Sequence, residues 1–274
     1  MNDFEIRFGG IARLYGAIGM ERLRTAHVCA VGLGGVGSWA VEALARSGLG
    51  RLTLVDLDEI CASNVNRQLH ALNGAVGRPK VEVMAERVRA ISPECVVRPR
   101  MEFFTAQNAD DIFREGYDAV LDAIDSVADK CRLIALCRSR GIHLVTCGSA
   151  GGRRDATMVR VADLAFTSHD RLLLRVRDEL RKLHGFPPAR MALGIPCVYS
   201  AEPPVFPRKD GSVGPRREAG SAVRLDCDTG LGTATFVTGA FGFVAAGLVV
   251  KKITEGPDII DQAGRKAGSN KPID

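Results

Sequence analysis

The sequence predicts an α/β protein with a Rossmann-like, doubly wound and mostly parallel sheet that carries helices on both faces. A C-terminal extension with an apolar helix of small residues follows it. Three observations predict this class. A strand, a glycine-rich turn, a helix and a second strand follow one another between residues 27 and 60. Strand-like and helix-like segments then alternate as far as residue 147, as parallel crossovers require. Residues 230–250 carry no charge.

The first unit predicts a nucleotide site. Residues 28–31 are an apolar, β-branched run typical of a buried parallel strand. Gly32, Gly34 and Gly37 then form G-x-G-x-x-G. This pattern permits a tight turn, a close approach of backbone to phosphate, and close packing of the helix expected from residue 36 to 46. The N-terminus of that helix directs N–H groups at an anion.

An acidic residue completes this unit. Asp56 ends the strand expected over residues 52–55. It follows the last glycine by about 20 residues, the spacing of an acceptor for ribose hydroxyls. The alternative is a glycine-rich turn that binds nothing.

The other expected elements follow in order. Residues 1–26 form a lead-in helix, and Ser63 caps a short helical segment over residues 64–68. Further helices are expected at 80–90, 107–114, 127–140 and 171–184, from apolar residues at helical spacing. Further strands are expected at 95–98, 117–124, 142–147, 157–161 and 197–200.

We expect a single domain over residues 1–255. It comprises the lead-in helix (1–26), a nucleotide-binding half (27–150), and a basic, substrate-side half that includes the C-terminal helix (151–255). Residues 185–221 are rich in Pro, Gly and Arg, which is typical of a long functional loop. The polar tail, residues 256–274, is expected to be disordered.

Composition sets wide limits. The chain has 274 residues, of which 46% are hydrophobic, as in one large domain or two small ones. Its net charge of +5 permits a nucleic-acid partner and equally fits a solvated basic surface. The N-terminus lacks the apolar segment of a signal peptide, so we expect a reducing cytoplasm.

The eight cysteines do not form a C-x-x-C pair, so the sequence has no zinc-ribbon signature. Cys29, Cys131 and Cys137 lie in apolar runs, where a free cysteine acts as a small hydrophobe. Cys197 and Cys227 are expected in polar loops, where we favour a structural role over a reactive one.

Residues 230–250 admit two interpretations. An uncharged run of about 20 residues is long enough to span a bilayer. However, the run contains several threonines and glycines and lacks a clear aromatic belt. Small residues also suit a helix that packs tightly inside a soluble protein. We favour this second interpretation, and therefore expect no association with a membrane.

A cluster of polar residues favours triphosphate chemistry over hydride transfer. A dehydrogenase needs a ribose acid and a nicotinamide pocket, but no Asn, Arg and Gln directly after its second strand. Arg67 and Lys80 are side chains of the kind that bind phosphates. Asp125 follows a predicted strand, where α/β sheets bind ligands, and a carboxylate there can hold Mg²⁺ against a triphosphate. Each residue alone would fit a surface salt bridge.

Five motifs resemble, in order and spacing, the adenylating superfamily that includes ubiquitin-activating enzymes and the enzymes that adenylate sulfur carriers. They are V-G-L-G-G-V-G, V-D-L-D-E-I, S-N-V-N-R-Q, G-R-P-K and L-D-A-I-D-S. The resemblance covers residues 7–150. It implies binding of ATP and Mg²⁺, with Asp125 as the metal ligand. The implied nucleotide-binding residues are Gly32, Gly34, Gly35, Gly37, Asp56, Asp58, Asn64, Arg67, Gln68, Lys80, Asp125 and Ser126.

The resemblance also implies a homodimer in which an N-terminal arginine reaches the partner's site. The superfamily pattern there is R-[FY]-x-R, whereas this chain has Arg7-Phe-Gly-Gly10 and lacks the second arginine. Arg13 is the candidate substitute. The catalytic set is therefore expected to be Arg67, Lys80, Asp125 and Arg13.

Three further segments resemble one branch of this superfamily, the enzymes that dehydrate threonylcarbamoyladenosine in transfer RNA. They are residues 7–16, 195–202 and 225–234. The branch implies ATP-dependent cyclisation through a carboxyl-adenylate, with transfer RNA held by the basic second half. A cysteine desulfurase or a sulfur acceptor is a further candidate partner that the resemblance implies. The alternatives are adenylation of a ubiquitin-like carrier ending in Gly-Gly, an NAD-dependent dehydrogenase, and a membrane-anchored binding protein.

Overall fold

The computed structural model describes residues 2–216 and 231–256. The strands are β1 (His27–Val31), β2 (Arg51–Val55), β3 (Val96–Arg100), β4 (Ala119–Asp122), β5 (His143–Cys147), β6 (Val159–Asp163), β7 (Pro196–Ser200), β8 (Phe206–Pro207) and β9 (Val213–Gly214). The α-helices are α1 (Asp3–Thr25), α2 (Gly35–Arg46), α3 (Lys80–Ile91), α4 (Ala109–Ile112), α5 (Val127–Ser139), α6 (Arg171–Leu183) and α7 (Thr235–Glu255). Short 3-10 turns join several of them.

Seven strands form one sheet in the order β3-β2-β1-β4-β5-β7-β6. All neighbouring strands are parallel except β6, which pairs with β7 in the antiparallel sense. From β1 the chain builds outward through β2 to β3, then returns to the other side of β1 for β4. The direction of winding therefore switches between β1 and β4. Ligands of open α/β sheets bind at the carboxyl ends of strands at such a switch point.

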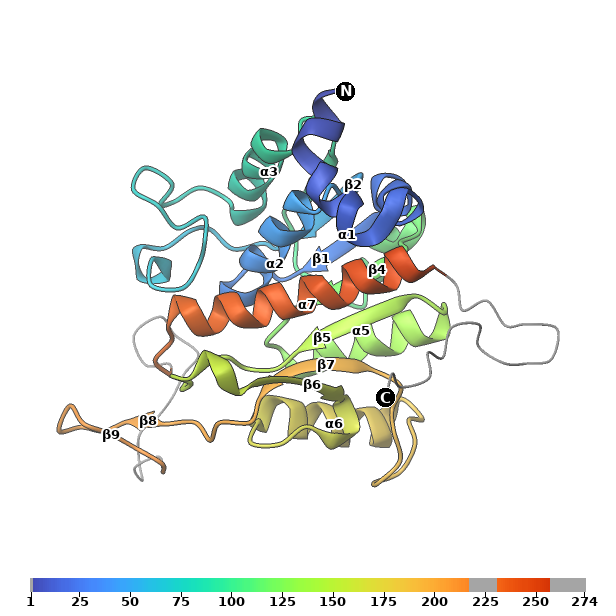
Figure 1. The fold of residues 1–274 in the computed structure, drawn as a ribbon. Coiled ribbons are helices and arrows are strands. Elements are labelled where there is room, and N and C mark those ends of the chain that lie inside the picture. The colour runs from blue at the N-terminus through green and yellow to red at the C-terminus, as the bar shows by residue number, and fades with distance from the viewer. Residues whose placement is uncertain (1, 217–230, 257–274) are drawn as a thin grey trace, which may run out of the picture.

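Helices cover both faces of the sheet (Figure 1). One hydrophobic cluster joins α1, α2, α3 and α7 to the first face, and a second joins α4, α5 and α6 to the other. Alternate residues of β2 serve the two clusters: Leu52 and Leu54 belong to the first, and Val55 to the second. The predicted fold class, including the C-terminal apolar helix, is confirmed.

Helix α7 lies across α2 on the first face (Figure 1). A Cβ at Gly242 would lie 2.6 Å from the carbonyl oxygen of Val36 and 2.8 Å from the amide nitrogen of Ala40, so only glycine permits this close approach. Val237, Phe241 and other apolar side chains of α7 are buried in the core. By length and composition α7 is the one described helix that could span a membrane, but 56% of its apolar stretch is buried inside the protein.

Several boundaries differ from the predicted ones. The lead-in segment is helical, but its backbone kinks at Gly16, where φ is +76°. The segment at 107–114 contains only the short helix α4 and a 3-10 turn, and the helix expected within residues 230–250 begins at Thr235. Apart from Gly256, the predicted disordered tail lies outside the described residues.

Candidate nucleotide-binding site

The glycine turn joins β1 to α2 at the switch point. Gly32 has φ of +89°, and its N–H donates to the carbonyl oxygen of Val55 at 2.9 Å. A Cβ at Gly37 would lie only 1.8 Å from the carbonyl oxygen of Gly32, so α2 packs directly on the turn. At Gly34 a Cβ would meet no atom within 4 Å. The first and third glycines are therefore needed for folding, whereas the second faces open space.

The N-terminus of α2 is suited to binding an anion. Gly34 is its N-cap, and no side chain caps the helix. The first N–H groups of a helix lack intrahelical partners and carry the positive end of the helix dipole. Gly35 lies beside them, and its Cβ would be 3.5 Å from Cγ of Arg67. The four predicted glycines thus lie in the turn and the first residues of α2, next to these free N–H groups.

Asp56 connects the turn to the end of β2. One carboxylate oxygen accepts from the N–H of Leu33 at 2.6 Å, and the other accepts from the N–H of Asp58 at 2.8 Å. The residue is buried, and burial raises the pKa of its carboxyl group, although the charge of Lys80 and these two N–H donors oppose the rise. Asp56 therefore fixes the shape of the turn. Each oxygen keeps a lone pair that a ribose hydroxyl could use.

Lys80 lies at the start of α3 and forms an ion pair with Asp58. Its Nζ is 2.7 Å from the Asp58 carboxylate, and the N–H of Lys80 donates to the carbonyl oxygen of Asp58 at 3.0 Å. The lysine side chain is 6% exposed, and that of the aspartate is 52% exposed. A buried cation is thus paired with an acid that faces solvent, at the edge of the site.

Arg67, Asn64 and Gln68 share one loop after β2. The guanidinium of Arg67 donates to the carbonyl oxygen of Ser63 at 2.7 Å, and its own carbonyl oxygen accepts from Trp39 Nε1 at 3.1 Å. Asn64 is buried and closes a 3-10 turn. Gln68 is also buried, and its Oε1 has no hydrogen-bond partner among the described residues. These contacts hold the loop against the N-terminus of α2.

Asp125 and Ser126 follow β4 in the loop before α5, and both are exposed. The Ser126 hydroxyl donates to Asp129 at 2.8 Å. Asp125 forms no hydrogen bond or ion pair with any other residue that the structure describes. Among the same residues, no three acidic, His or Cys side chains gather to hold a metal. A single free carboxylate fits Mg²⁺ that arrives with phosphates, since Mg²⁺ is held by one or two carboxylates plus substrate oxygens and water.

The N-terminal arginines lie apart from these residues, on α1. Arg7 donates to the Asp3 carboxylate at 2.6 Å and to the carbonyl oxygen of Ile91 at 3.3 Å. Arg13 is exposed, and it pairs with no described residue. The structure therefore brings together the predicted glycines, the Asp56–Lys80 group, the loop residues and Asp125, but not Arg13. Its expected role in a partner's site stays a prediction.

Sequence reasoning missed residues that support the site. His70, in the loop that contains Gln68, is buried, and neither ring nitrogen has a partner among the described residues. Burial, and then the charge of Lys80, lower the pKa of His70 to about 4, so the ring is neutral. Lys130 is fully buried and pairs with Asp122. A sequence signal for Lys130 exists: it falls on the apolar stripe of α5, beside Cys131 and Ile134.

The strand expected at residues 197–200 is confirmed as β7, so the separate expectation that Cys197 lies in a polar loop was wrong. It lies inside β7 with no exposed surface, and burial raises the pKa of its thiol well above the usual value. Its neighbours in a proline-rich stretch suggested a polar loop, but β7 occupies the sheet interior next to β5. Cys29, Cys131 and Cys137 are buried as predicted. Cys227 lies outside the described residues.

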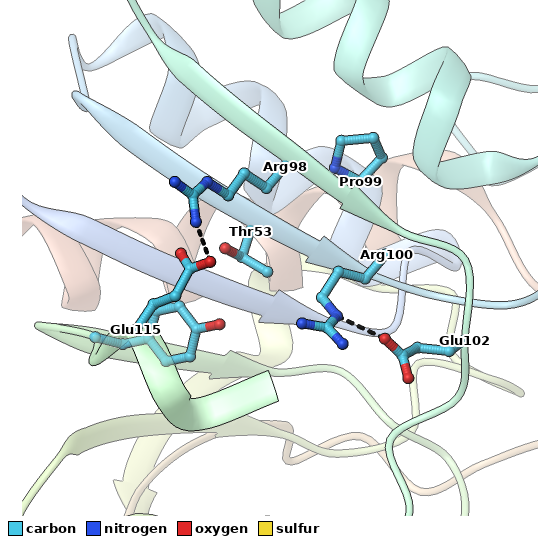
Figure 2. A pocket seen from close by; sticks show the side chains of 7 residues that line it. Thr53, Arg98, Pro99, Arg100, Glu102 and Glu115 are labelled. Carbon is cyan, nitrogen blue, oxygen red and sulfur yellow. Dashed lines mark hydrogen bonds and ion pairs between the residues drawn. The ribbon is translucent and has the colours of Figure 1, made fainter. Parts of the chain in front are cut away.

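A cavity of about 390 Å³ lies elsewhere, along β2 and β3 (Figure 2). Its charged side chains pair with one another: Arg98 with Glu115, and Arg100 with Glu102. It contains none of the predicted nucleotide-binding residues. The candidate site is therefore the open turn and its neighbours, not this cavity.

The fold and the site define an α/β protein of the nucleotide-binding class, with a glycine turn at the switch point of its sheet. Comparison with known proteins identifies the family within this class. The chain belongs to the ThiF family, which matches residues 10–263.

The relatives that match nearly the whole chain are, by their names, enzymes that act on transfer RNA. The tRNA threonylcarbamoyladenosine dehydratase of Escherichia coli K12 is 49% identical over 249 residues, covering 90% of this chain and 93% of that protein. The enzyme of Haemophilus influenzae is 45% identical over 254 residues, covering 92% and 95%. The Escherichia coli enzyme solved in complex with ATP matches with a TM-score of 0.82 at 44% identity, covering 93% of this chain and 96% of that one. Its complex with AMP gives a TM-score of 0.83 at 45% identity, with the same coverage.

A more distant relative covers less of the chain. The molybdopterin-synthase adenylyltransferase of Salmonella typhimurium is 36% identical over 131 residues, 47% of this chain and 51% of that protein.

Proposed function

We propose that the protein catalyses the ATP-dependent dehydration of threonylcarbamoyladenosine in transfer RNA, through a carboxyl-adenylate. One observation carries the proposal: similarity to dehydratases extends over 90% of both chains, including the second half, whereas similarity to a carrier-protein adenylyltransferase covers 47% of this chain. The second half is where an acceptor must be recognised, because the nucleotide-binding residues all lie in the first.

The charge distribution supports transfer RNA as the partner. Residues 151–216 contain twelve Lys and Arg against seven Asp and Glu, so this segment accounts for the whole net charge of +5. Arg171, Arg175 and Lys182 are exposed on α6. Lys and Arg that neutralise phosphates supply most of the affinity of a protein for a nucleic acid.

In the first step, the triphosphate lies on the glycine turn, with its phosphates at the N-terminus of α2 and its ribose at Asp56. The threonine carboxylate of the substrate attacks the α-phosphorus, an O–P bond forms, and pyrophosphate leaves. Arg67 and Lys80, with Arg13 of a second subunit, stabilise the negative charge that develops on the phosphates. Mg²⁺ held at Asp125 would neutralise phosphate charge during this step.

In the second step, the carbamoyl group of the same nucleoside attacks the activated carbonyl carbon. A bond from the carbamoyl group to that carbon closes the ring, the bond to AMP breaks, and a carbamoyl nitrogen loses a proton. The substrate thereby loses the elements of one water, while ATP becomes AMP and pyrophosphate. Attack within one molecule needs little from the protein beyond orientation, so no cysteine nucleophile is required.

We further propose that residues 1–255 form a single adenylating domain, that the protein is cytoplasmic, and that it is a homodimer. Ile6, Leu14 and Ile18 on α1 are between 66% and 72% exposed, which supports a second subunit covering this helix. Light scattering would test the dimer. A cysteine-desulfurase or sulfur-acceptor partner stays a prediction, which co-purification would test.

The decisive experiment measures the mass of the modified nucleoside, released from transfer RNA after incubation with protein and ATP. Loss of one water, dependent on ATP, is the expected result. A parallel reaction supplies a ubiquitin-like carrier ending in Gly-Gly. Pyrophosphate release that depends on the carrier alone, with unchanged nucleoside mass, would support the carrier-adenylating alternative and refute the proposal.

A further inference from the structure

A fully buried ion pair lies beneath the nucleotide site. Nζ of Lys130, on α5, is 2.9 Å from an oxygen of Asp122, the last residue of β4, and neither side chain has exposed surface. The other Asp122 oxygen accepts from the hydroxyl of Thr146 on β5 at 2.7 Å. The pair thus joins two strands and a helix at the carboxyl edge of the sheet.

The same two side chains hold the loop that leads to Asp125. Nζ of Lys130 donates to the carbonyl oxygen of Ile124 at 2.9 Å, and the N–H of Ile124 donates to Asp122 at 3.0 Å. Both backbone polar groups of Ile124 are therefore fixed by the buried pair. Ile124 directly precedes Asp125, so its orientation sets the point from which the Asp125 side chain leaves the backbone.

The loop also rests on the glycine turn. The N–H of Ala123 donates to the carbonyl oxygen of Val31 at 2.9 Å. A Cβ at Gly32 would lie 2.8 Å from the carbonyl oxygen of Ala123, so turn and loop are in direct contact. The distance between the phosphate-binding turn and the Asp125 carboxylate therefore depends on a loop whose backbone is held by hydrogen bonds at Ala123 and Ile124.

Stability alone does not explain this pair. Moving two charges out of water costs several kcal/mol per ion, and apolar residues of similar volume often stabilise a fold equally well or better. We propose that Lys130 and Asp122 are positioning residues, which hold Asp125 at the distance from the glycine turn that a magnesium-bound triphosphate requires. This inference rests on the proposed function, in particular on Asp125 as the metal ligand.

The test uses the variant Lys130→Met/Asp122→Asn. Removing both charges leaves no unpaired buried ion, and Asn can still accept from Ile124 and hydrogen-bond with Thr146. The bond from Lys130 to Ile124 is lost. Calorimetry then measures binding of a non-hydrolysable ATP analogue with and without Mg²⁺. We expect metal-free binding to stay within about twofold of wild type, and the tightening by Mg²⁺ to fall roughly 10-fold or more, as for residues that orient metal ligands.

Two controls separate the outcomes. Arg87→Met removes one partner of Glu42, between α2 and α3 and away from the loop; it should lower the unfolding midpoint and leave the magnesium effect unchanged. Asp125→Ala should abolish the magnesium effect. If Asp125→Ala leaves that effect intact, the metal assignment in the proposed function fails. If Asp125→Ala abolishes it and the double variant keeps it, only the positioning inference is overturned.

A milder variant covers the case in which the double variant does not fold. Thr146→Val keeps both charges and removes one hydrogen bond to Asp122. We expect a reduction of the magnesium effect in the same direction but smaller, with metal-free affinity unchanged. A folded Thr146→Val protein with the wild-type response, together with an unfolded double variant, would assign the pair a purely structural role and overturn the inference.

Discussion

The glycine turn permits a paired test of which glycine serves folding and which serves binding. In Gly37→Ala the new Cβ would lie 1.8 Å from the carbonyl oxygen of Gly32, whereas real contacts of this kind almost never fall below 3.0 Å. Helix α2 would have to shift by more than an ångström against backbone, which cannot rotate away as a side chain can. Overpacking in a well-packed core costs about 1–3 kcal/mol, and we expect the upper end of this range.

Gly34→Ala is the matched control, because the added Cβ would meet no atom within 4 Å. Gly34 is an N-cap with φ of −72°, so alanine causes no left-handed strain there. We expect it to lower the unfolding free energy by less than about 1 kcal/mol. However, the methyl group would occupy the space that a phosphate needs, so ATP should bind at least roughly tenfold more weakly, which is 1.4 kcal/mol.

Urea unfolding and calorimetric titration with ATP measure the two quantities for both variants. The expected result is a stable Gly34→Ala protein with weak binding and a destabilised Gly37→Ala protein. Wild-type affinity in Gly34→Ala would show that the triphosphate does not lie on this turn, and the reasoning about the site would be refuted.

Three other predictions follow from the same contacts. Arg67→Ala and Lys80→Ala should each lower kcat/KM for adenylation, by an amount equivalent to a loss of about 2–4 kcal/mol in transition-state stabilisation. Steady-state pyrophosphate release measures kcat/KM, and an effect on KM for ATP alone would contradict a catalytic role. Burial lowers the pKa of His70 to about 4, so the unfolded state binds the proton first and the free energy of unfolding falls as pH drops from about 6.5 towards 4. In urea unfolding, wild type should lose about 2 kcal/mol more of its unfolding free energy than His70→Asn between pH 7.5 and 5. Gly242→Ala should destabilise the protein by about 2 kcal/mol because the added Cβ meets the backbone of α2. In the control Gly247→Ala the added Cβ meets no atom within 4 Å, so this variant should be neutral or stabilising, and equal thermal midpoints of the two variants would argue against α7 packing on α2.

The features predicted best from sequence are those that depend on local spacing. The turn around Gly32 needs a strand before it and a helix after it, and each has its own periodicity. The position of Asp56 then follows, because a helix of known length must bring the chain back to the adjacent strand. Strand ends were less well predicted: β4 ends at Asp122 and not at residue 124, so Asp125 lies in a loop. Periodicity marks the interior of a strand but does not define where its pairing stops.

Contacts between distant segments were not predictable from spacing. Lys130 was visible as a charge on an apolar helix face, but its partner could be any acid that the fold brings beneath α5. The burial of Cys197 likewise depends on β7 lying between β5 and β6, an order that a proline-rich sequence does not reveal. Tertiary context decides such cases, because the same short segment can be an exposed loop or an interior strand.

The acids at the end of β2 show how one motif combines folding with binding. Asp56 uses both oxygens to hold backbone N–H groups, so its first contribution is to shape the turn. Asp58 pairs with the buried ammonium of Lys80, and a buried cation without a partner would be costly. Because the Asp58 side chain is half exposed, phosphate oxygens arriving from solvent would compete with it for the same ammonium. If Lys80 has the proposed role, the ion pair with Asp58 would limit how much Lys80 contributes to binding the triphosphate in the ground state. The contribution of Lys80 would then be larger in a transition state in which the phosphates carry more negative charge.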